Sequence, residues 1–317
     1  MSPSLVPTES HVAVVREGCG LVDRSERGKL ALTGAQAKEF LAGQVTNDIV
    51  GLEPGTGCYA AFLSHKGKMQ GDLRVLDLGD ELWLDTERPA LQALFDMIRR
   101  FKIGYDVELH KRTLERALLS LVGPRARAVA GAEQLPSAEH SSMRATRGGA
   151  EVVLVTTFDG VDVICAAEDA DAVRGALVAA GAVEVPDAAA DLLRVEAGRP
   201  RFGVDVDDTT IPQEAGLNDR AVSFTKGCYV GQETVARLFY KGKPNRHLRG
   251  LELHGPAQTG DALRLGEREV GRLGTVVESP DRGTIALALV RREAEPGATL
   301  TVGDAGASAT VVELPFR

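Results

Sequence analysis

The sequence feature that most restricts the fold is a change in hydrophobic pattern near residue 245. Before this point, alternating runs typical of strands are mixed with apolar stripes at helical spacing. One such stripe consists of Leu91, Leu94, Phe95 and Ile98. After it, short alternating runs separated by glycines are typical of a small antiparallel barrel or sandwich. These runs are His247–Leu253, Glu269–Val277, Thr284–Val290, Thr299–Val302 and Ser308–Leu314. We therefore predict an α+β region over residues 1–245 and a β-domain over residues 246–317.

The α+β region contains two stretches of strands and helices in similar order. In the first, Thr33 and Gln36 have the spacing of a capping box for the helix that follows. In the second, Asp159-Gly160 separates two alternating runs and is the strongest short hairpin signal in the chain. The repeated order predicts a duplicated α+β unit, with subdomains of about residues 1–112 and 113–245.

Length and composition restrict the function as well. A chain of 317 residues exceeds the size at which one hydrophobic core stops growing, so we expect more than one core. The 37 basic and 45 acidic residues give a net charge of −8. DNA is not an expected partner, because duplex affinity depends on phosphate neutralisation by Lys and Arg. No apolar run approaches the ~20 residues that span a bilayer, and the start of the chain shows no secretory pattern. We expect a cytoplasmic protein without a membrane partner.

The cysteines do not form a metal-binding pattern. Cys19, Cys58, Cys165 and Cys228 are scattered, without a C-x-x-C motif or a paired Cys/His cluster. The histidines also lack the spacing of ligands, so no metal site is predicted. Reduced thiols are the expectation for a cytosolic chain. Three of the four cysteines are interpreted as buried packing residues, and only Cys228 lies in a segment that suggests chemistry.

That segment is Lys226-Gly-Cys-Tyr-Val-Gly-Gln-Glu233. Its two glycines allow the backbone to come close to a ligand or a neighbour. A helix starting at Gln232 would place Cys228 near a helix N-terminus, and Lys226 is two residues away. Both features favour the thiolate and lower the pKa of a thiol, as a reactive or metal-coordinating cysteine requires. The alternative interpretation is a glycine-rich turn with a buried thiol.

Two further positions are candidate ligand contacts. Glu196 ends an otherwise apolar helix, where the helix dipole disfavours a carboxylate. A carboxylate can accept two parallel N–H bonds from a planar edge such as an aminopyrimidinone. The alternative is a salt bridge to a nearby arginine, for which the choices are Arg194, Arg199 and Arg201. Asn47, in Thr-Asn-Asp, is either a turn residue or a ligand contact.

Taken together, three segments resemble the YgfZ-type folate-binding proteins, relatives of the glycine cleavage aminomethyltransferase (T protein). These segments are Leu192–Gly203, Pro212–Leu217 and Lys226–Glu233, with support from Phe40–Asp48 and Gly67–Val75. The similarity extends from about Gly20 to the C-terminal strands. It implies an α+β fold: a duplicated, ferredoxin-like folate-binding region followed by a small C-terminal antiparallel β-barrel.

The resemblance also implies a function: tetrahydrofolate-dependent assembly or repair of iron–sulfur clusters in client enzymes. It implies catalytic roles for Cys228 and Lys226, and partners among iron–sulfur client or assembly proteins. Glu196 matches the glutamate that contacts the pterin in the aminomethyltransferases. The other positions expected to contact folate are Asp72, Asn47, Gln232, Tyr229 and Arg237.

One departure from the related enzymes leaves alternatives open. Aminomethyltransferases carry paired aspartates where this chain has Gly71 and Asp72. The loss of one aspartate argues against aminomethyl transfer, although a folate-dependent aminomethyl or methyl transferase remains the first alternative. A folate-dependent tRNA-modification factor is the second, and the net charge of −8 argues against it.

Overall fold

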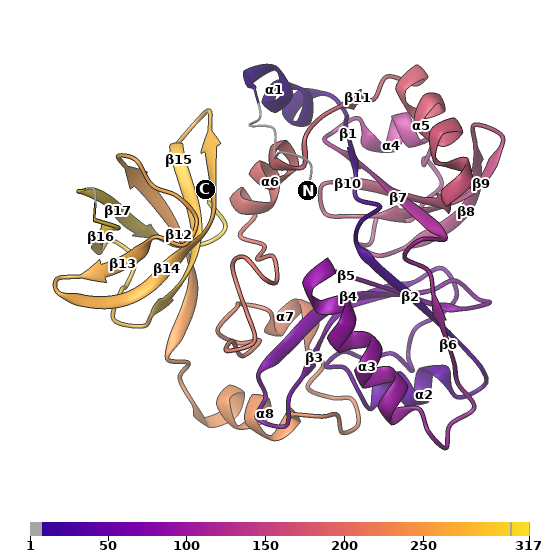
Figure 1. Ribbon diagram of the computed structural model, residues 1–317, viewed down its shortest axis with the longest axis horizontal. Coiled ribbons are helices and arrows are strands. Elements are labelled where there is room, and N and C mark those ends of the chain that lie inside the picture. Colours follow the sequence, from indigo (N-terminus) through magenta and orange to yellow (C-terminus); the bar gives the residue numbers. More distant parts are fainter. Residues whose placement is uncertain (1–7, 305, 317) are drawn as a thin grey trace.

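The computed structural model describes residues 8–304 and 306–316 and consists of two α/β units and a barrel (Figure 1). The barrel lies on one side of the molecule and the two sheets on the other, with helix α6 (Asp187–Glu196) between them. The predicted α+β fold with a C-terminal barrel is therefore confirmed.

The first unit is a five-stranded antiparallel sheet with the order β3-β4-β5-β2-β6. Its strands are β2 (Gly28–Thr33), β3 (Gly57–Leu63), β4 (Met69–Asp77), β5 (Leu82–Thr86) and β6 (Glu108–Lys111). Its helices are α2 (Ala37–Ala42) and α3 (Leu91–Phe101), and α3 follows a short 3-10 turn at Arg88–Ala90.

The second unit is a six-stranded sheet with the order β11-β1-β7-β10-β9-β8. Its strands are β1 (Gly20–Asp23), β7 (Arg116–Val122), β8 (Ser142–Arg147), β9 (Ala150–Thr156), β10 (Gly160–Ala166) and β11 (Val183–Glu184). Its helices are α4 (Ala126–Ala130) and α5 (Ala170–Ala179), and α5 follows a 3-10 turn at Ala167–Asp169.

The two units repeat one topology, which confirms the predicted duplication. In each unit the order along the chain is strand, helix, three strands, 3-10 turn, helix, strand. In each, the first strand pairs with the last of the three consecutive strands: β2 with β5, and β7 with β10. The difference is β1, which enters the second sheet between β7 and β11 and pairs with β11 in parallel. The N-terminal segment therefore completes the second unit before the chain builds the first, which the sequence pattern did not predict.

Local signals were partly correct in the first unit. The apolar stripe of α3 is confirmed, because Leu94 and Ile98 are fully buried in the core. The capping box at Thr33 and Gln36 is wrong. No side chain caps α2; the Thr33 hydroxyl pairs with His110 Nε2 at 2.8 Å, and Gln36 Oε1 accepts from the backbone N–H of Asp106 at 2.9 Å. Cross-strand and loop partners thus outcompete the local cap.

The C-terminal domain is a closed antiparallel barrel with the cyclic order β12-β15-β14-β13-β16-β17. Its strands are β12 (Arg246–His254), β13 (Ala262–Leu265), β14 (Arg268–Ser279), β15 (Gly283–Arg291), β16 (Thr299–Val302) and β17 (Ala307–Val312). Closure leaves no free strand edge, so the barrel alternative is confirmed over the sandwich. The sequence analysis did not predict the four-residue strand β13.

Helix α6 joins the barrel to the sheets. Val195 is buried in a cluster with Leu248, Ile285 and Leu287 of the barrel. Beside it, the Arg194 guanidinium donates to Asp205 Oδ2 at 2.7 Å and to the Thr275 hydroxyl at 2.6 Å. The remaining helices are α1 (Glu9–Glu17), α7 (Asn218–Ala221) and α8 (Gln232–Lys241). The apolar cluster and the buried ion pair hold α6 between the sheets and the barrel.

Candidate functional site

A cavity of about 160 Å³ is formed jointly by both units, α6 and α7. We call it the central cavity. Its lining includes seven arginines and six acidic residues, an unusual density of charge for an enclosed space. The arginines are Arg24, Arg27, Arg74, Arg194, Arg199, Arg201 and Arg220, and the acidic residues are Asp72, Asp85, Glu87, Glu139, Asp159 and Asp162. Buried charges must be paired, so the pairing shows which groups face a ligand.

The floor of the cavity is a closed ionic network between the two sheets. Arg74 on β4 donates to Asp85 Oδ2 on β5 and to Asp162 Oδ2 on β10, both at 2.7 Å. The Ser120 hydroxyl donates to the other oxygen of Asp162 at 2.6 Å, and Trp83 Nε1 donates to Asp85 at 3.1 Å. These groups satisfy one another, so their role is to hold the two units together.

Asp72 also lines the central cavity, but its carboxyl is not part of this ionic network. The Tyr59 hydroxyl on β3 donates to Asp72 Oδ2 at 2.6 Å, and the Arg220 guanidinium lies 5.0 Å from the centre of the Tyr59 ring. Burial raises the pKa of Asp72 to about 6. A carboxyl with that pKa can exchange a proton near neutral pH, which makes Asp72 the best-placed acid or base in the cavity.

Gly71, the position of the missing aspartate, faces away from the cavity. Successive strand residues point to opposite faces of a sheet, and a Cβ at Gly71 would come within 2.5 Å of the Phe62 ring and 2.6 Å of the Ala90 Cβ. The core thus fills the space of a second carboxylate. The aspartate that this chain retains is the one on the cavity side.

Asn47 supports this arrangement from behind. Its amide donates to the carbonyl oxygens of Tyr59, at 2.8 Å, and Arg220, at 3.2 Å. Asn47 is not among the residues that line the central cavity within the described ranges. It therefore positions two cavity residues, and its direct contact with a ligand stays a prediction.

The opposite wall holds an aromatic ring and a cation in contact. The Arg199 guanidinium lies 4.1 Å from the centre of the Phe158 ring and is bound by both carboxylate oxygens of Glu139, at 2.5 and 3.0 Å. Phe158 remains 38% exposed. A planar ligand can stack on such a pair. Burial lowers the pKa of the adjacent His140 to about 4, so this histidine is neutral at physiological pH.

A second cavity, of about 660 Å³, adjoins the central one, because both are lined by Thr157, Phe158 and Asp159. Glu196 lines this second cavity. Its carboxylate accepts from the Ser279 hydroxyl at 2.8 Å and forms an ion pair with Arg16 of α1. A salt bridge exists, as the alternative interpretation expected, but its partner is Arg16 rather than an arginine close in sequence.

The Cys228 loop, residues 225–231, lies outside both cavities. Cys228 is exposed, so the alternative of a buried thiol in a turn is wrong. Gly231, in the left-handed region with φ 84°, is the N-cap of α8, three residues after Cys228. The other cysteines differ: burial raises the pKa of Cys19 and Cys165 to about 11 and that of Cys58 to about 12.

Lys226 anchors this loop. Its ammonium donates to the carbonyl oxygen of Ala42, the last residue of α2, and at 2.8 Å to that of Val45, and lies 4.8 Å from the centre of the Tyr229 ring. Burial lowers the pKa of Lys226 to about 8. The ammonium is thus bound to the backbone of the first unit, and a catalytic role for Lys226 stays a prediction.

The other predicted folate contacts are distributed along the same segment. Tyr229 packs in the core of the first unit, Gln232 is the first residue of α8, and Arg237 is exposed on α8. In the described part of the chain, none of the three lines the central or the second cavity. The structure therefore brings Asp72 to one compartment and Glu196 to the next, and places Tyr229, Gln232 and Arg237 elsewhere.

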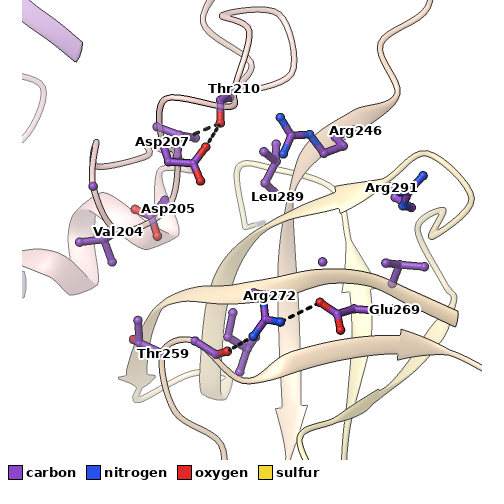
Figure 2. A pocket seen from close by; sticks show the side chains of 16 residues that line it. Val204, Asp205, Asp207, Thr210, Arg246, Thr259, Glu269, Arg272, Leu289 and Arg291 are labelled. Atoms are coloured by element: carbon purple, nitrogen blue, oxygen red, sulfur yellow. Dashed lines mark hydrogen bonds and ion pairs between the residues drawn. The ribbon is translucent and has the colours of Figure 1, made fainter. Parts of the chain in front are cut away.

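A third cavity, also of about 660 Å³, lies between the turn at residues 203–210 and the barrel strands β14 and β15 (Figure 2). Most of its charged groups bind one another or neighbouring groups, and Arg291 at its rim is exposed. Arg272 pairs with Glu269 at 3.0 Å, Arg246 pairs with Glu214 at 2.9 Å, and Asp207 accepts from Thr210 at 3.0 Å. This pairing leaves few groups for a ligand, so we do not assign the site here.

Several site residues were not found from the sequence. Tyr59, Arg220, Arg199, Phe158 and Glu139 come from five separate segments, and only tertiary structure brings them together. The one local signal is the position of Phe158 directly before the Asp159-Gly160 turn, which places an aromatic ring at the end of a predicted hairpin. Across residues 8–304 and 306–316, no group of three or more His, Cys, Asp or Glu side chains is placed to hold a metal ion. No helix in the described ranges is long and apolar enough to cross a membrane.

Comparison with known proteins agrees with this architecture. Residues 6–226 match the family described as GCVT N-terminal domain, and residues 246–314 match the family described as CAF17, C-terminal beta-barrel domain. An aminomethyltransferase of Rubrobacter xylanophilus is 30% identical over 315 residues, which cover 95% of this chain and 84% of that protein. One from Geobacillus thermodenitrificans is 32% identical over 330 residues, with coverage of 97% and 89%.

A similar fold is present in the crystal structure of glycine cleavage system aminomethyltransferase T from Bartonella henselae. The TM-score is 0.86 and the identity 24%, and the match covers 97% of this chain and 89% of that one. At this identity the likeness establishes the shared fold.

Proposed function

Because the chain belongs to the YgfZ-type branch of the aminomethyltransferase-like family, we propose that it binds tetrahydrofolate and supports the assembly or repair of iron–sulfur clusters in other enzymes. Folate occupies the central cavity and the adjoining second cavity. Cys228, on a separate surface, acts on the partner. The coarse family assignment rests on the comparisons, and the ligand and the role are our proposal.

The observation that carries the folate proposal is the cavity-facing Tyr59–Asp72 pair beside Arg220. The Asp72 carboxyl accepts from an N–H of the ligand or exchanges a proton there, and Tyr59 fixes its orientation at 2.6 Å. The Phe158–Arg199 stack at 4.1 Å supplies a surface for a planar ring. These groups bind and orient a planar ligand in a confined space.

The two adjoining compartments suit an elongated ligand with two ring systems. Glu196, in the second compartment, can accept two N–H bonds from the aminopyrimidinone edge of a pterin. Since its carboxylate is paired with Arg16 and Ser279, the pterin must share or displace the Arg16 guanidinium. Asp72 then meets the part of the ligand that extends into the central cavity.

The exposure of Cys228 supports its proposed role toward a partner. A thiol that lies outside both folate compartments and is exposed can reach a cluster, a persulfide or a thiol on another protein. The glycines on both sides allow the loop to approach a partner's backbone closely. In this proposal Lys226 and Tyr229 hold the loop in place for that contact.

The test is direct titration of the full-length protein with tetrahydrofolate by calorimetry, with Asp72→Asn as the variant. Loss of the carboxylate should weaken binding roughly 10- to 150-fold, the worth of about 1.5–3 kcal/mol for a hydrogen bond to a charged group. A wild-type protein that binds no tetrahydrofolate would sink the proposal.

A one-carbon transferase is the second candidate, and one observation favours it. The retained aspartate, Asp72, is on the cavity side, whereas the lost one maps to Gly71 in the core. The loss at position 71 is thus weaker grounds against aminomethyl transfer than the sequence suggested. Formation of methylene-tetrahydrofolate from tetrahydrofolate and an aminomethyl donor, abolished by Asp72→Asn, would favour this candidate.

A further inference from the structure

The Cys228 loop is bordered by an exposed aromatic patch formed by Phe224, Phe239 and Tyr240. The Phe224 and Phe239 rings stack with their centres 3.9 Å apart, and Tyr240 meets Phe239 edge-on at 5.0 Å. Phe239 is 44% and Tyr240 67% exposed. Because Phe224 precedes the loop and Phe239 lies on α8 after it, the stack joins the two ends of the segment that carries Cys228.

A groove of about 360 Å³ borders the loop at its other end, where Val230 is part of the lining. The apolar members of this lining are Leu63, Ala93, Met97, Phe101 and Val230. Gln44 also lines the groove, and its Oε1 atom is buried without a hydrogen-bond partner among the described residues. A buried acceptor left unpaired is costly, so this atom is suited to an N–H that arrives with a ligand.

The elements around these two features are basic, although the chain as a whole is acidic. Residues 223–245 contain four cations and one acidic residue, 4 − 1 = +3, and residues 91–103 contain three and one, 3 − 1 = +2. The whole chain has a net charge of −8. The cations nearest the patch on α8 and its end, Arg237, Lys241 and Lys243, are exposed. A local positive field of this kind favours an acidic partner.

We propose that the groove, the aromatic patch and their cations form one docking surface for the partner protein on which Cys228 acts. The partner binds through a segment in which an apolar side chain is flanked by acidic residues. The apolar side chain enters the groove, a backbone N–H of the segment donates to Gln44 Oε1, and the acidic residues meet Lys241 and Lys243. This inference rests on the proposed role of Cys228.

A polypeptide fits these features better than a nucleic acid does. Exposed aromatic rings with lysines can also stack and bind single-stranded RNA. However, the Phe224 and Phe239 rings occupy each other's faces at 3.9 Å, and the groove presents the acidic side chain of Asp96 and the unpaired acceptor of Gln44, neither of which favours a phosphate backbone. RNA binding is therefore an outcome that the tests must be able to reveal.

The first experiment compares full-length variants in a strain from which the gene for this protein has been deleted. The readout is the activity of an iron–sulfur enzyme that is reduced by this deletion. Lys241→Glu combined with Lys243→Glu should abolish most of this activity, as Cys228→Ser should, with tetrahydrofolate affinity changed less than twofold. The matched control is Arg88→Glu with Arg292→Glu, an equal charge change at exposed residues without ion pairs in the described ranges. A charge-reversed variant that keeps full activity while Cys228→Ser loses it would overturn the docking surface alone. Full activity of Cys228→Ser would instead reject the proposed thiol function.

The second experiment needs no known client. Random dodecapeptides displayed on phage are selected on the immobilised wild-type protein. Enriched peptides should combine an apolar residue with acidic ones, and should bind at least about tenfold more weakly to the Lys241→Glu/Lys243→Glu protein. Gln44→Met should weaken capture while raising the thermal unfolding midpoint, which a merely structural role would not do. Peptides without acidic residues, equal binding to the charge-reversed protein, or stronger capture of oligouridylate RNA than of any peptide would each overturn the proposal.

Discussion

The central cavity and the Cys228 loop differ in how far their polar and charged groups are paired and buried. In the cavity, most charged groups have partners at hydrogen-bond distance, as Arg74 does with Asp85 and Asp162 at 2.7 Å. In the loop the thiol is exposed, and around the loop Phe239 and Tyr240 of α8 are partly exposed and Gln44 of the groove has an unpaired acceptor in the described structure. The difference teaches that the cavity groups already hold one another in place, as the proposed small ligand requires, whereas the surface around the loop keeps exposed groups that the proposed partner would cover.

The largest expected effect is on the free energy of unfolding, which should fall for a variant in the central cavity but not for one in the Cys228 loop. Arg74→Ala leaves Asp85 and Asp162 as buried charges with one partner fewer, so the free energy of unfolding should fall by about 3–5 kcal/mol. Cys228→Ser, at an exposed position, should stay within about 0.5 kcal/mol. Urea denaturation measures both.

The control for Arg74 is Arg144→Ala, because Arg144 also bridges elements but is 59% exposed in its pair with Asp80. An exposed pair contributes only about 0–1 kcal/mol. Equal losses of unfolding free energy in the Arg74 and Arg144 variants would show that the ionic network at the cavity floor does not hold the two units together.

The next effect concerns pH and is confined to the cavity. Burial raises the pKa of Asp72 to about 6 from 3.8, so the folded state holds this proton more tightly and the stabilisation is lost as pH rises from about 4 through 6. Burial lowers the pKa of His140 to about 4 from 6.5, so its contribution is lost as pH falls through the same range. In the wild type the two dependences oppose each other.

Asp72→Asn removes the pH dependence that Asp72 contributes and leaves that of His140. The variant's stability should then rise between pH 4 and 6.5, relative to wild type, by on the order of 2–3 kcal/mol. Thermal unfolding across this pH range tests it, with Cys228→Ser as a variant whose curve should parallel the wild type. Parallel curves for Asp72→Asn would mean that Asp72 is not the buried, protonated carboxyl of the cavity.

Ligand affinity gives the third effect. Glu196→Ala should weaken tetrahydrofolate binding by about 1.5–3 kcal/mol, roughly 10- to 150-fold, through the loss of one charge-assisted hydrogen bond. The matched control is Glu278→Ala on β14, whose exposed carboxylate binds Thr284 rather than a cavity group. Calorimetry measures both, and unchanged affinity in Glu196→Ala would reject the pterin contact.

The smallest effect belongs to the loop anchor. Lys226→Met removes the bonds to the carbonyl oxygens of Ala42 and Val45 but keeps the aliphatic contact with Tyr229. Stability should fall by about 1 kcal/mol, and amide hydrogen exchange should rise in residues 225–231 but not in β4. Exchange that rises equally in both segments would indicate general unfolding rather than release of the loop.

The sequence predicted what depends on local order and missed what depends on distant partners. The duplicated unit, the barrel and the α3 stripe are visible as periodicity, because each element must bury one face. The exposed position of Cys228 was left open, since a glycine-rich turn fits either a buried or an exposed thiol. The Arg16 partner of Glu196 is 180 positions away in the chain, and spacing cannot reveal such a pair.

The same limit applies to the site as a whole. Asp72 could be proposed from the family resemblance, but Tyr59 and Arg220 are far apart in the sequence, and Asn47 binds the carbonyl oxygens of both. The failed cap at Thr33 has a similar cause, since His110 on a neighbouring strand takes the hydroxyl. Pairings across strands and units decided these contacts, and a single sequence does not encode them in any local pattern.

The position of β1 has a consequence for how the protein is made. During synthesis residues 20–23 leave the ribosome before the first sheet does, yet their partners are β7 and β11, and β11 at residues 183–184 follows about 160 residues later. The strands of the first sheet, within residues 28–111, can pair with one another before β1 has either of its partner strands. A change in residues 20–23 therefore acts on the second sheet, although these residues precede the first sheet in the chain.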